Sequence, residues 1–280
     1  MATSAPQAVR PATPAEPSAA AGPVAPWRPG LVLRDIALGG LAALPVGVLI
    51  GGVGARVAMR LAAIRVPAAT GRLTENGNEI GEITLAGTVA LVVFMGLFAG
   101  VAAAVVWVTA RPWIPGRTRV RIVLAMPIAV ALGSFAIIEG TNPDFAVLGH
   151  DPLVVALLVG VIALIGAGVA ALDAWLDGRL PYPTSGASPS TAAYGMLAGL
   201  GGLLAALMIV PAYFVPALRP VGIALVVTGA ATVAWWIQQT RGVEAPRAWT
   251  IIVGRTGLAA AVVIGFITLA PDLAVALAVD

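Results

Sequence analysis

The chain has 280 residues, of which 59% are hydrophobic and 10% are charged, and its formal net charge is +3. Soluble domains have about 25% charged residues, so this composition excludes a soluble enzyme, a nucleic-acid-binding protein and a disordered scaffold. It predicts an all-α, polytopic helical membrane protein, because a lipid-exposed helix satisfies its own backbone hydrogen bonds.

Residues 1–30 are rich in proline and alanine and contain no apolar stretch typical of a secretory signal. We expect a disordered cytoplasmic tail here, followed by a transmembrane helical bundle over residues 31–280. All sixteen basic residues are arginines. The absence of lysine, with abundant alanine and glycine, is typical of a GC-rich bacterial genome.

About seven transmembrane helices are predicted, because seven apolar segments follow the tail and about 20 apolar residues span a bilayer. The segment 122–138 is short and contains Pro127, so the sequence leaves open whether this segment crosses the whole membrane. The seven segments are 36–55, 83–110, 122–138, 152–172, about 191–215, 221–239 and about 249–270.

Arginines beside these spans predict the orientation, since cytoplasmic loops carry an excess of basic residues. With a cytoplasmic N-terminus and seven spans, ten arginines face the cytoplasm and five lie on the other side. The four arginines between 111 and 121 contribute most to this difference. We therefore expect a multi-pass protein of the bacterial cytoplasmic membrane whose partner is the lipid bilayer. Tryptophans 107, 113, 175, 235, 236 and 249 are predicted to form an interfacial belt on the cytoplasmic side.

The end of the first span supplies one candidate ligand site in the outer loops. Arg56 and Arg60 are four residues apart and share a helix face, and Glu75, Glu79 and Glu82 follow in the next loop. Paired guanidiniums suit a carboxylate or phosphate group. The alternative interpretation is an arginine-flanked helix end, followed by a solvated turn at Asn76-Gly77.

A second outer loop carries Glu139, Asp144, His150 and Asp151. Oxygen and nitrogen ligands suit a divalent cation or a proton relay, but the spacing matches no metal motif, and we expect neither a metal nor a cofactor. The structural alternative has Asn142-Pro143 opening a turn, with Asp151 capping the helix that Pro152 begins.

Arg255 is the one charged residue inside a predicted span. An arginine in a span suggests function, and Asp35 or Asp173 are candidate partners. Alternatively, the Arg255 side chain snorkels to the interface. The GxxxG pairs Gly47/Gly51, Gly96/Gly100 and Gly195/Gly199 are expected to serve close helix packing within one bundle rather than dimerisation. The oligomeric state is left open.

The stretches GARVAMRLAAI, TENGNEIGEITLAGT and TNPDFAVLG resemble a family of uncharacterised bacterial, mostly actinobacterial, integral membrane proteins. The resemblance covers roughly residues 36–175. It implies a multi-pass topology and draws attention to the two loops, and it implies no activity.

The sequence contains no GxSxG, HExxH or phosphate-binding loop, so we expect a protein that is not an enzyme. The leading hypothesis is a multi-pass integral membrane protein that binds a small or anionic ligand through Arg56, Arg60, Glu75, Glu79, Glu139 and Asp144. Two alternatives stay open. One is a small-solute permease with hinges at Pro45, Pro127 and Pro211. The other is a membrane anchoring or assembly subunit that uses the N-terminal tail.

Overall fold

The computed structural model describes residues 28–277, except for 75–78, 83, 137, 141, 184–187 and 214–218. Regular secondary structure in the described residues is helical throughout, with one isolated β-bridge between Leu73 and Glu79. The predicted all-α class is confirmed. The predicted tail falls outside the described residues up to position 27, as does the turn at Asn76-Gly77.

At most of their ends, the helices are longer than the apolar segments predicted from the sequence. Two of them contain π-helical stretches, η1 and η3, so that α1, η1 and α2 form one continuous helix, as do α3, η3 and α4. The elements are α1 (Pro29–Val46), η1 (Gly47–Gly54), α2 (Ala55–Arg65), α3 (Leu85–Ala90), η3 (Leu91–Gly96), α4 (Leu97–Ala110), α5 (Thr118–Gly133), α6 (Pro143–Val147), α7 (Pro152–Asp177), α8 (Pro189–Tyr213), α9 (Arg219–Thr240) and α10 (Ala248–Ala276), with short 3₁₀ turns η2 (Pro67–Ala69) and η4 (Ser134–Ala136).

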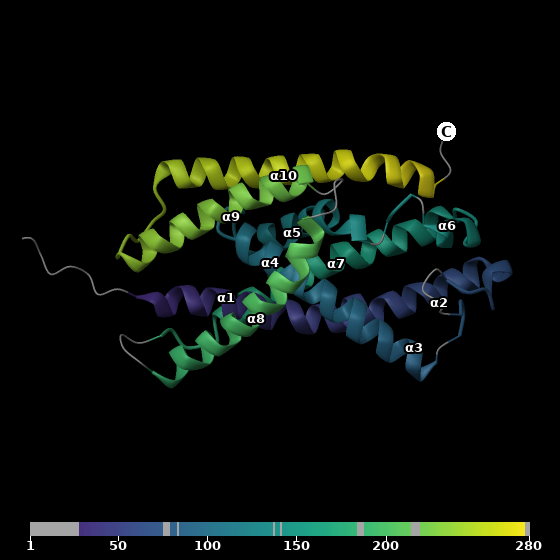
Figure 1. Cartoon of the computed structure of the whole chain (residues 1–280), viewed down its shortest axis with the longest axis horizontal. Coiled ribbons are helices and arrows are strands. Elements are labelled where there is room, and N and C mark those ends of the chain that lie inside the picture. Colours follow the sequence, from purple (N-terminus) through teal and green to yellow (C-terminus); the bar gives the residue numbers. More distant parts are fainter. Residues whose placement is uncertain are drawn as a thin grey trace, which may run out of the picture.

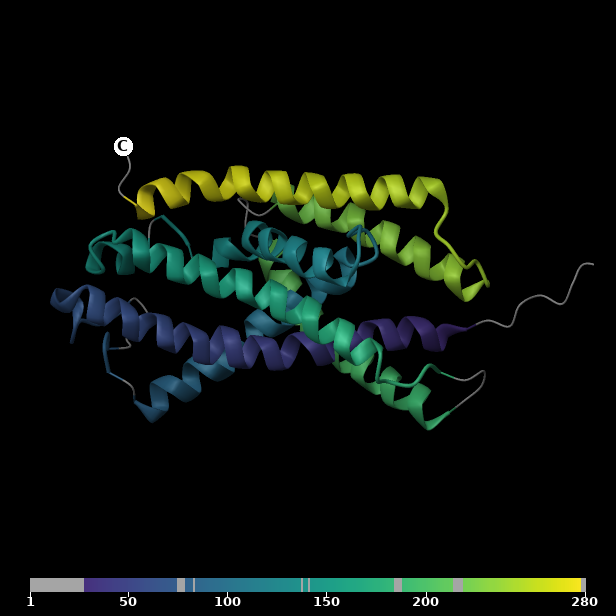
Figure 2. The same cartoon turned by 180° about the vertical axis from the view of Figure 1, so that it is seen from behind.

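The bundle is elongated, and its helices run mainly along the long axis (Figure 1). At the N-terminal end, α1 begins beside the ends of α7 and α9: Arg34 binds Asp177, and the Arg28 N–H donates to the Thr240 carbonyl. At the opposite end, the last turns of α10 lie against Ile138, Gly140 and His150. There Asp272 accepts from the Gly140 N–H, and His150 Nδ1 lies 3.1 Å from the Ala276 carbonyl. Seen from behind, α7 runs diagonally between these two ends (Figure 2).

Four helices in the described chain are long and apolar enough to cross a membrane. They are Pro29–Arg65, Pro152–Asp177, Pro220–Thr240 and Ala248–Ala276. This marks a membrane-embedded protein, but the predicted count of about seven spans is not confirmed. Among the other helices, α4 has 14 residues and α5 has 16.

The expected capping at the start of α7 is confirmed. The Asp151 carboxylate accepts from the Leu153 N–H at 2.8 Å, and Pro152 occupies the first helical position. The side chain of Asn142 likewise caps α6, which begins at Pro143. Both turns form as the local sequence predicts, because a side-chain oxygen satisfies a helix N–H that has no partner inside the helix.

Two of the predicted GxxxG pairs pack against each other where η1 crosses η3 and α4. A Cβ built on Gly47 would clash with the backbone of Gly96 and Gly100, and one on Gly52 would lie 2.8 Å from Val92 Cα. The absence of side chains therefore lets these two helices touch backbone to backbone. The expectation of close packing within one bundle is confirmed for these pairs. Gly199, by contrast, has open space beside it.

The core lies between α1, α4, α5 and α7, with α10 on one side. Trp107 and Trp113 belong to it, with 6% and 1% of their surface exposed. The Trp113 indole N–H donates to Thr232 Oγ1 at 2.9 Å, which supplies the acceptor that a buried indole needs. The predicted interfacial belt is thus wrong for these two residues. Trp175 and Trp249 are half exposed.

Candidate functional site

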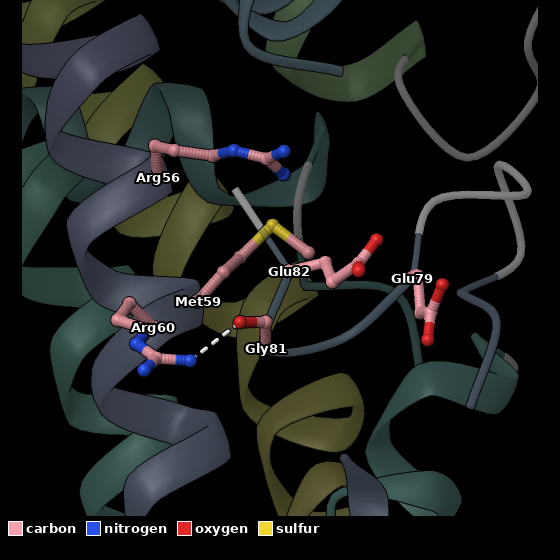
Figure 3. Close-up of a pocket in the computed structure, with 6 residues that line it drawn as sticks. All are labelled: Arg56, Met59, Arg60, Glu79, Gly81 and Glu82. Carbon is pink, nitrogen blue, oxygen red and sulfur yellow. Dashed lines mark hydrogen bonds between the residues drawn. The ribbon is translucent and has the colours of Figure 1, made fainter. Parts of the chain in front are cut away.

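Arg56 and Arg60 line one hollow at the end of the bundle that lies opposite the start of α1. Met59, Glu79, Gly81 and Glu82 line the same hollow (Figure 3). Both arginines are on α2. The helix of the first predicted span therefore continues through them to Arg65 instead of ending at residue 55. Their i, i+4 spacing places them on one face of this helix. The hollow therefore brings the predicted arginine pair together with two of the three acids that the sequence places in the next loop, Glu79 and Glu82.

The loop after α2 is fixed over this face by Ile80. Its side chain is 2% exposed and packs against Ala63 and Ala69. Its N–H donates to the Arg72 carbonyl, and its carbonyl accepts from Gly71. Gly81 then turns the chain with φ of +90°, a conformation that disfavours side chains. This turn presents the Gly81 carbonyl to the Arg60 guanidinium.

The Arg56 side chain is buried and unpaired. The residue is 8% exposed, and its Nε has no hydrogen-bond partner. No ion pair joins Arg56 or Arg60 to an acid in the described part of the chain. The exposed carboxylates of Glu79 and Glu82 lie across the hollow from Arg60 (Figure 3). A buried cation without a partner is energetically unfavourable, so this hollow is suited to an anionic group.

The other predicted ligand residues are not in this hollow. Glu75 lies outside the described residues. Glu139 is exposed, and Asp144 sits in the first turn of α6, whose Phe145 packs with Ile138 and Leu269 near the end of α10. The loop after α2 and the segment between α6 and α7 do touch elsewhere: Val147 and Leu148 pack against the group formed by Ala63, Ala69 and Ile80.

The loop that precedes α7 contacts the rest of the bundle through Asp151 and His150. Asp151 caps α7 and forms an ion pair with Arg65 at 3.0 Å. His150 adopts φ of +53° while its ring contacts the Ala276 carbonyl. Over the described ranges, no group of three or more His, Asp or Glu side chains is placed to hold a metal ion.

Arg255 has an exposed side chain on α10, and within the described residues it forms no ion pair. The pairing with Asp35 or Asp173, one of the two readings of the sequence, is wrong. Both carboxylates bind another arginine, Arg111.

Arg111 joins three helices at the N-terminal end of the bundle. It directly follows α4, and it binds Asp35 of α1 at 2.6 Å and Asp173 of α7 at 2.9 Å. Burial acts to lower the pKa of Arg111, but the two carboxylates outweigh it and raise its pKa above the ordinary value. The guanidinium therefore stays charged and holds the three helices together.

Arg34 forms a second buried contact beside this one. It is 2% exposed, binds Asp177 at 2.6 Å and donates to the carbonyls of Asp177, Leu180 and Pro181 at the end of α7. Its guanidinium also lies 4.0 Å from the ring centre of Tyr182. Arg34 thus satisfies carbonyls that the end of a helix leaves without partners.

Sequence reasoning assigned Arg34 and Arg111 only to the count of cytoplasmic arginines. A usable signal was present: Asp35, Arg111 and Asp173 each lie within about two turns of the same predicted membrane face. Charges at equal depth on neighbouring helices tend to pair, because an unpaired charge in lipid is unfavourable. What the sequence lacks is the order in which the helices neighbour each other.

The fold and these charged groups define a membrane-embedded, all-helical protein with a guanidinium-lined hollow at one end. No protein-family model matches the chain, and comparisons with curated proteins and with solved structures return no match. The resemblance to a family of bacterial membrane proteins stays a prediction.

Proposed function

We propose that this protein binds a small, singly charged anionic group, a carboxylate or a phosphodiester, in the hollow formed by Arg56 and Arg60. The observation that carries the proposal is the buried Arg56 guanidinium, whose Nε has no hydrogen-bond partner. An anion placed there compensates the buried charge and accepts from the free N–H groups. Arg60, already bound to the Gly81 carbonyl, is exposed at the entrance.

The charges around the hollow restrict the ligand. Glu79 and Glu82 equal the two arginines in number, so the four residues are formally neutral. A multiply charged anion gains little attraction from a neutral group, whereas one negative oxygen in contact with Arg56 gains a local hydrogen bond. This favours a monoanion over a di- or trianion.

The size of the hollow also restricts the ligand. Its interior volume is about 10 Å³, which is room for about one water molecule. Only one oxygen of the anionic group fits beside Arg56, and the rest of the ligand lies outside. A phosphodiester of a lipid headgroup and the carboxylate of a soluble molecule both meet this condition.

We further propose about seven spans in a bacterial cytoplasmic membrane, with the N-terminus in the cytoplasm. The support is that α3, η3 and α4 form one helical run of 26 residues from Leu85 to Ala110, and that α8 has 25 residues. Each is about 38 Å long, enough for a hydrocarbon core of about 30 Å. The arginines between 111 and 121 indicate that the N-terminal end of the bundle faces the cytoplasm.

Thermal unfolding of the detergent-solubilised protein tests the ligand proposal. The probes are sodium acetate, sodium dimethyl phosphate and phosphatidylglycerol micelles, with sodium chloride at equal ionic strength as the reference. We expect at least one probe to raise the Tm of the wild-type protein more than that of Arg56→Met, because ligand binding stabilises only the folded state that holds it.

The arms of this experiment separate the ligand sources. A shift with acetate or dimethyl phosphate indicates a soluble ligand, and a shift with phosphatidylglycerol alone indicates a lipid headgroup. Arg72→Met is the matched control. Arg72 is an exposed arginine in the loop that follows α2, and it does not line the hollow. Equal Tm values with all probes and with chloride, or equal shifts in wild type and Arg56→Met, overturn the proposal.

A small-solute permease is the second candidate, and one observation favours it. The π-helical stretches η1 and η3 lie within membrane-length helical runs and cross each other directly. Such stretches often mark functional positions, and Pro45 stands two residues before η1. Uptake of radiolabelled acetate into proteoliposomes checks this candidate: uptake equal to that of empty liposomes argues against acetate transport. The anchoring alternative depends on the N-terminal tail, outside the described residues.

A further inference from the structure

A groove of about 420 Å³ lies at the N-terminal end of the bundle, between the end of α9 and the start of α10. It is separate from the Arg56 hollow at the opposite end (Figure 1). Its volume is within the range of about 300–1,000 Å³ that is usual for ligand sites. The lining residues are Ala234, Ile237, Gln238, Arg241, Val243, Arg247 and Trp249.

The groove has a polar part and an apolar part. Arg241 and Arg247 are exposed, and neither guanidinium has an ion pair within the described chain. Ile237 and Trp249, 45% and 50% exposed, supply apolar wall. The combination of two free cations with an apolar wall at the boundary of two candidate spans matches the chemistry of a phospholipid.

Gln238 fixes the turn that carries the two arginines. Its backbone carbonyl accepts from the N–H groups of Arg241 and Val243, and its side-chain oxygen accepts from the Arg247 N–H at 3.0 Å. Gly242 adopts φ of +80°, which lets the chain reverse here. Both arginines are therefore held at the edge of the groove by a buried, hydrogen-bonded side chain rather than by a loose loop.

We propose that this groove binds one anionic phospholipid, with its phosphate between Arg241 and Arg247 and an acyl chain along Ile237 and Trp249. A free phosphate ion would use the arginines but not the apolar wall, so the groove favours the lipid. Trp249 suits this boundary, because its ring is apolar and its N–H is polar. Glu244 lies in the same turn but does not line the groove. The site is independent of the one proposed at Arg56.

Native mass spectrometry of the whole chain, released from detergent with phosphatidylglycerol or phosphatidylcholine, tests this proposal. We expect the wild-type protein to retain phosphatidylglycerol in preference to phosphatidylcholine. Each arginine near an anionic headgroup contributes roughly a fivefold change in affinity, so Arg241→Ala/Arg247→Ala should bind phosphatidylglycerol roughly 25-fold more weakly. Arg56→Met should keep this binding, which separates the two proposed sites.

The matched control is Arg119→Ala/Arg121→Ala. It removes the same charge from two exposed arginines of α5, at the same end of the bundle and outside the groove. Equal losses in the two double variants would mean a general attraction between charges and would overturn the proposal, as would unchanged binding in Arg241→Ala/Arg247→Ala. Circular dichroism and gel filtration establish that each variant is folded before its binding is compared.

A second measurement separates lipid from free phosphate. Phosphatidylglycerol with brominated acyl chains should quench tryptophan fluorescence of the wild-type protein more than it quenches Trp249→Phe, because bromine quenches an indole in contact with it. If Arg241→Ala/Arg247→Ala shows the same quenching as the wild-type protein, the two arginines do not position the lipid, which contradicts the proposal. Inorganic phosphate that displaces the brominated lipid at equal ionic strength shows that the phosphate group alone is recognised.

Discussion

Arg111 and Asp35 form an ion pair of 2.6 Å between the end of α4 and the second turn of α1, far apart in the sequence but at the same end of the bundle. Asp173 of α7 binds the same guanidinium. All three side chains have a quarter or less of their surface exposed, between 12% and 24%. The group therefore connects three helices where water is scarce and each charge depends on the other two.

Replacing Arg111 by alanine should destabilise the protein by about 3 kcal/mol or more, because it leaves two largely buried carboxylates without a cation. Thermal unfolding in detergent measures the change. Arg117→Ala, an exposed arginine of the same loop, is the control and should change little. The triple variant Asp35→Asn/Arg111→Met/Asp173→Asn should regain most of the lost stability. Equal Tm values for Arg111→Ala and Arg117→Ala would contradict the structural role of the group.

Replacing Arg56 by methionine should have the opposite effect on stability when no ligand is present. The substitution keeps an unbranched side chain of similar length and removes a buried, unpaired charge, so the free energy of unfolding should rise by about 1 kcal/mol or more. The comparison is Arg65→Met, which breaks the exposed pair with Asp151 and should lower stability by about 1 kcal/mol or less. A large destabilisation by Arg56→Met would mean that the guanidinium is already satisfied.

The contact between η1 and α4 makes a third prediction. Gly47→Ala should destabilise the protein by about 1–3 kcal/mol, because the added methyl group meets the backbone of Gly96 and Gly100. Gly40 of the preceding helix α1 has open space at its Cβ position. Gly40→Ala should therefore be neutral or stabilise the helix by up to about 1 kcal/mol. If the two variants unfold at the same temperature, the close crossing is absent.

The local parts of this fold could be predicted from the sequence. Hydropathy located the helices, and Asp151-Pro152 predicted where α7 begins, because a cap and its helix are neighbours in the chain. The Arg56–Arg60 pair and its nearness to Glu79 were also predicted, since only a short loop separates them.

The parts that depend on helix neighbours could not be predicted. The sequence predicts Arg111 in a loop and Trp113 at the interface, but both side chains contact helices distant in the sequence. Trp113 is buried, and the Arg111 side chain is 15% exposed. The position of a residue along an apolar segment predicts its depth in the membrane, but it does not predict which helix the residue faces. The groove at Arg241 and Arg247 is a different case, because its lining residues lie between Ala234 and Trp249. It depends on the hydrogen bonds of Gln238 and the positive φ of Gly242, which set the turn between α9 and α10.

Cysteine labelling in intact cells tests the proposed topology, and the natural chain contains no cysteine to interfere. Leu73 and Thr118 are exposed and lie at opposite ends of the bundle. Ala146, also exposed, lies in α6 at the same end as Leu73. An impermeant thiol reagent should label Leu73→Cys and Ala146→Cys but not Thr118→Cys, if α3 to α4 and α5 each cross the membrane. Labelling of Thr118→Cys alone would invert the orientation and place the Arg56 hollow in the cytoplasm. Labelling of all three would mean that segment 85–136 does not cross the membrane twice. Labelling in permeabilised cells is the control, which shows that each cysteine can react.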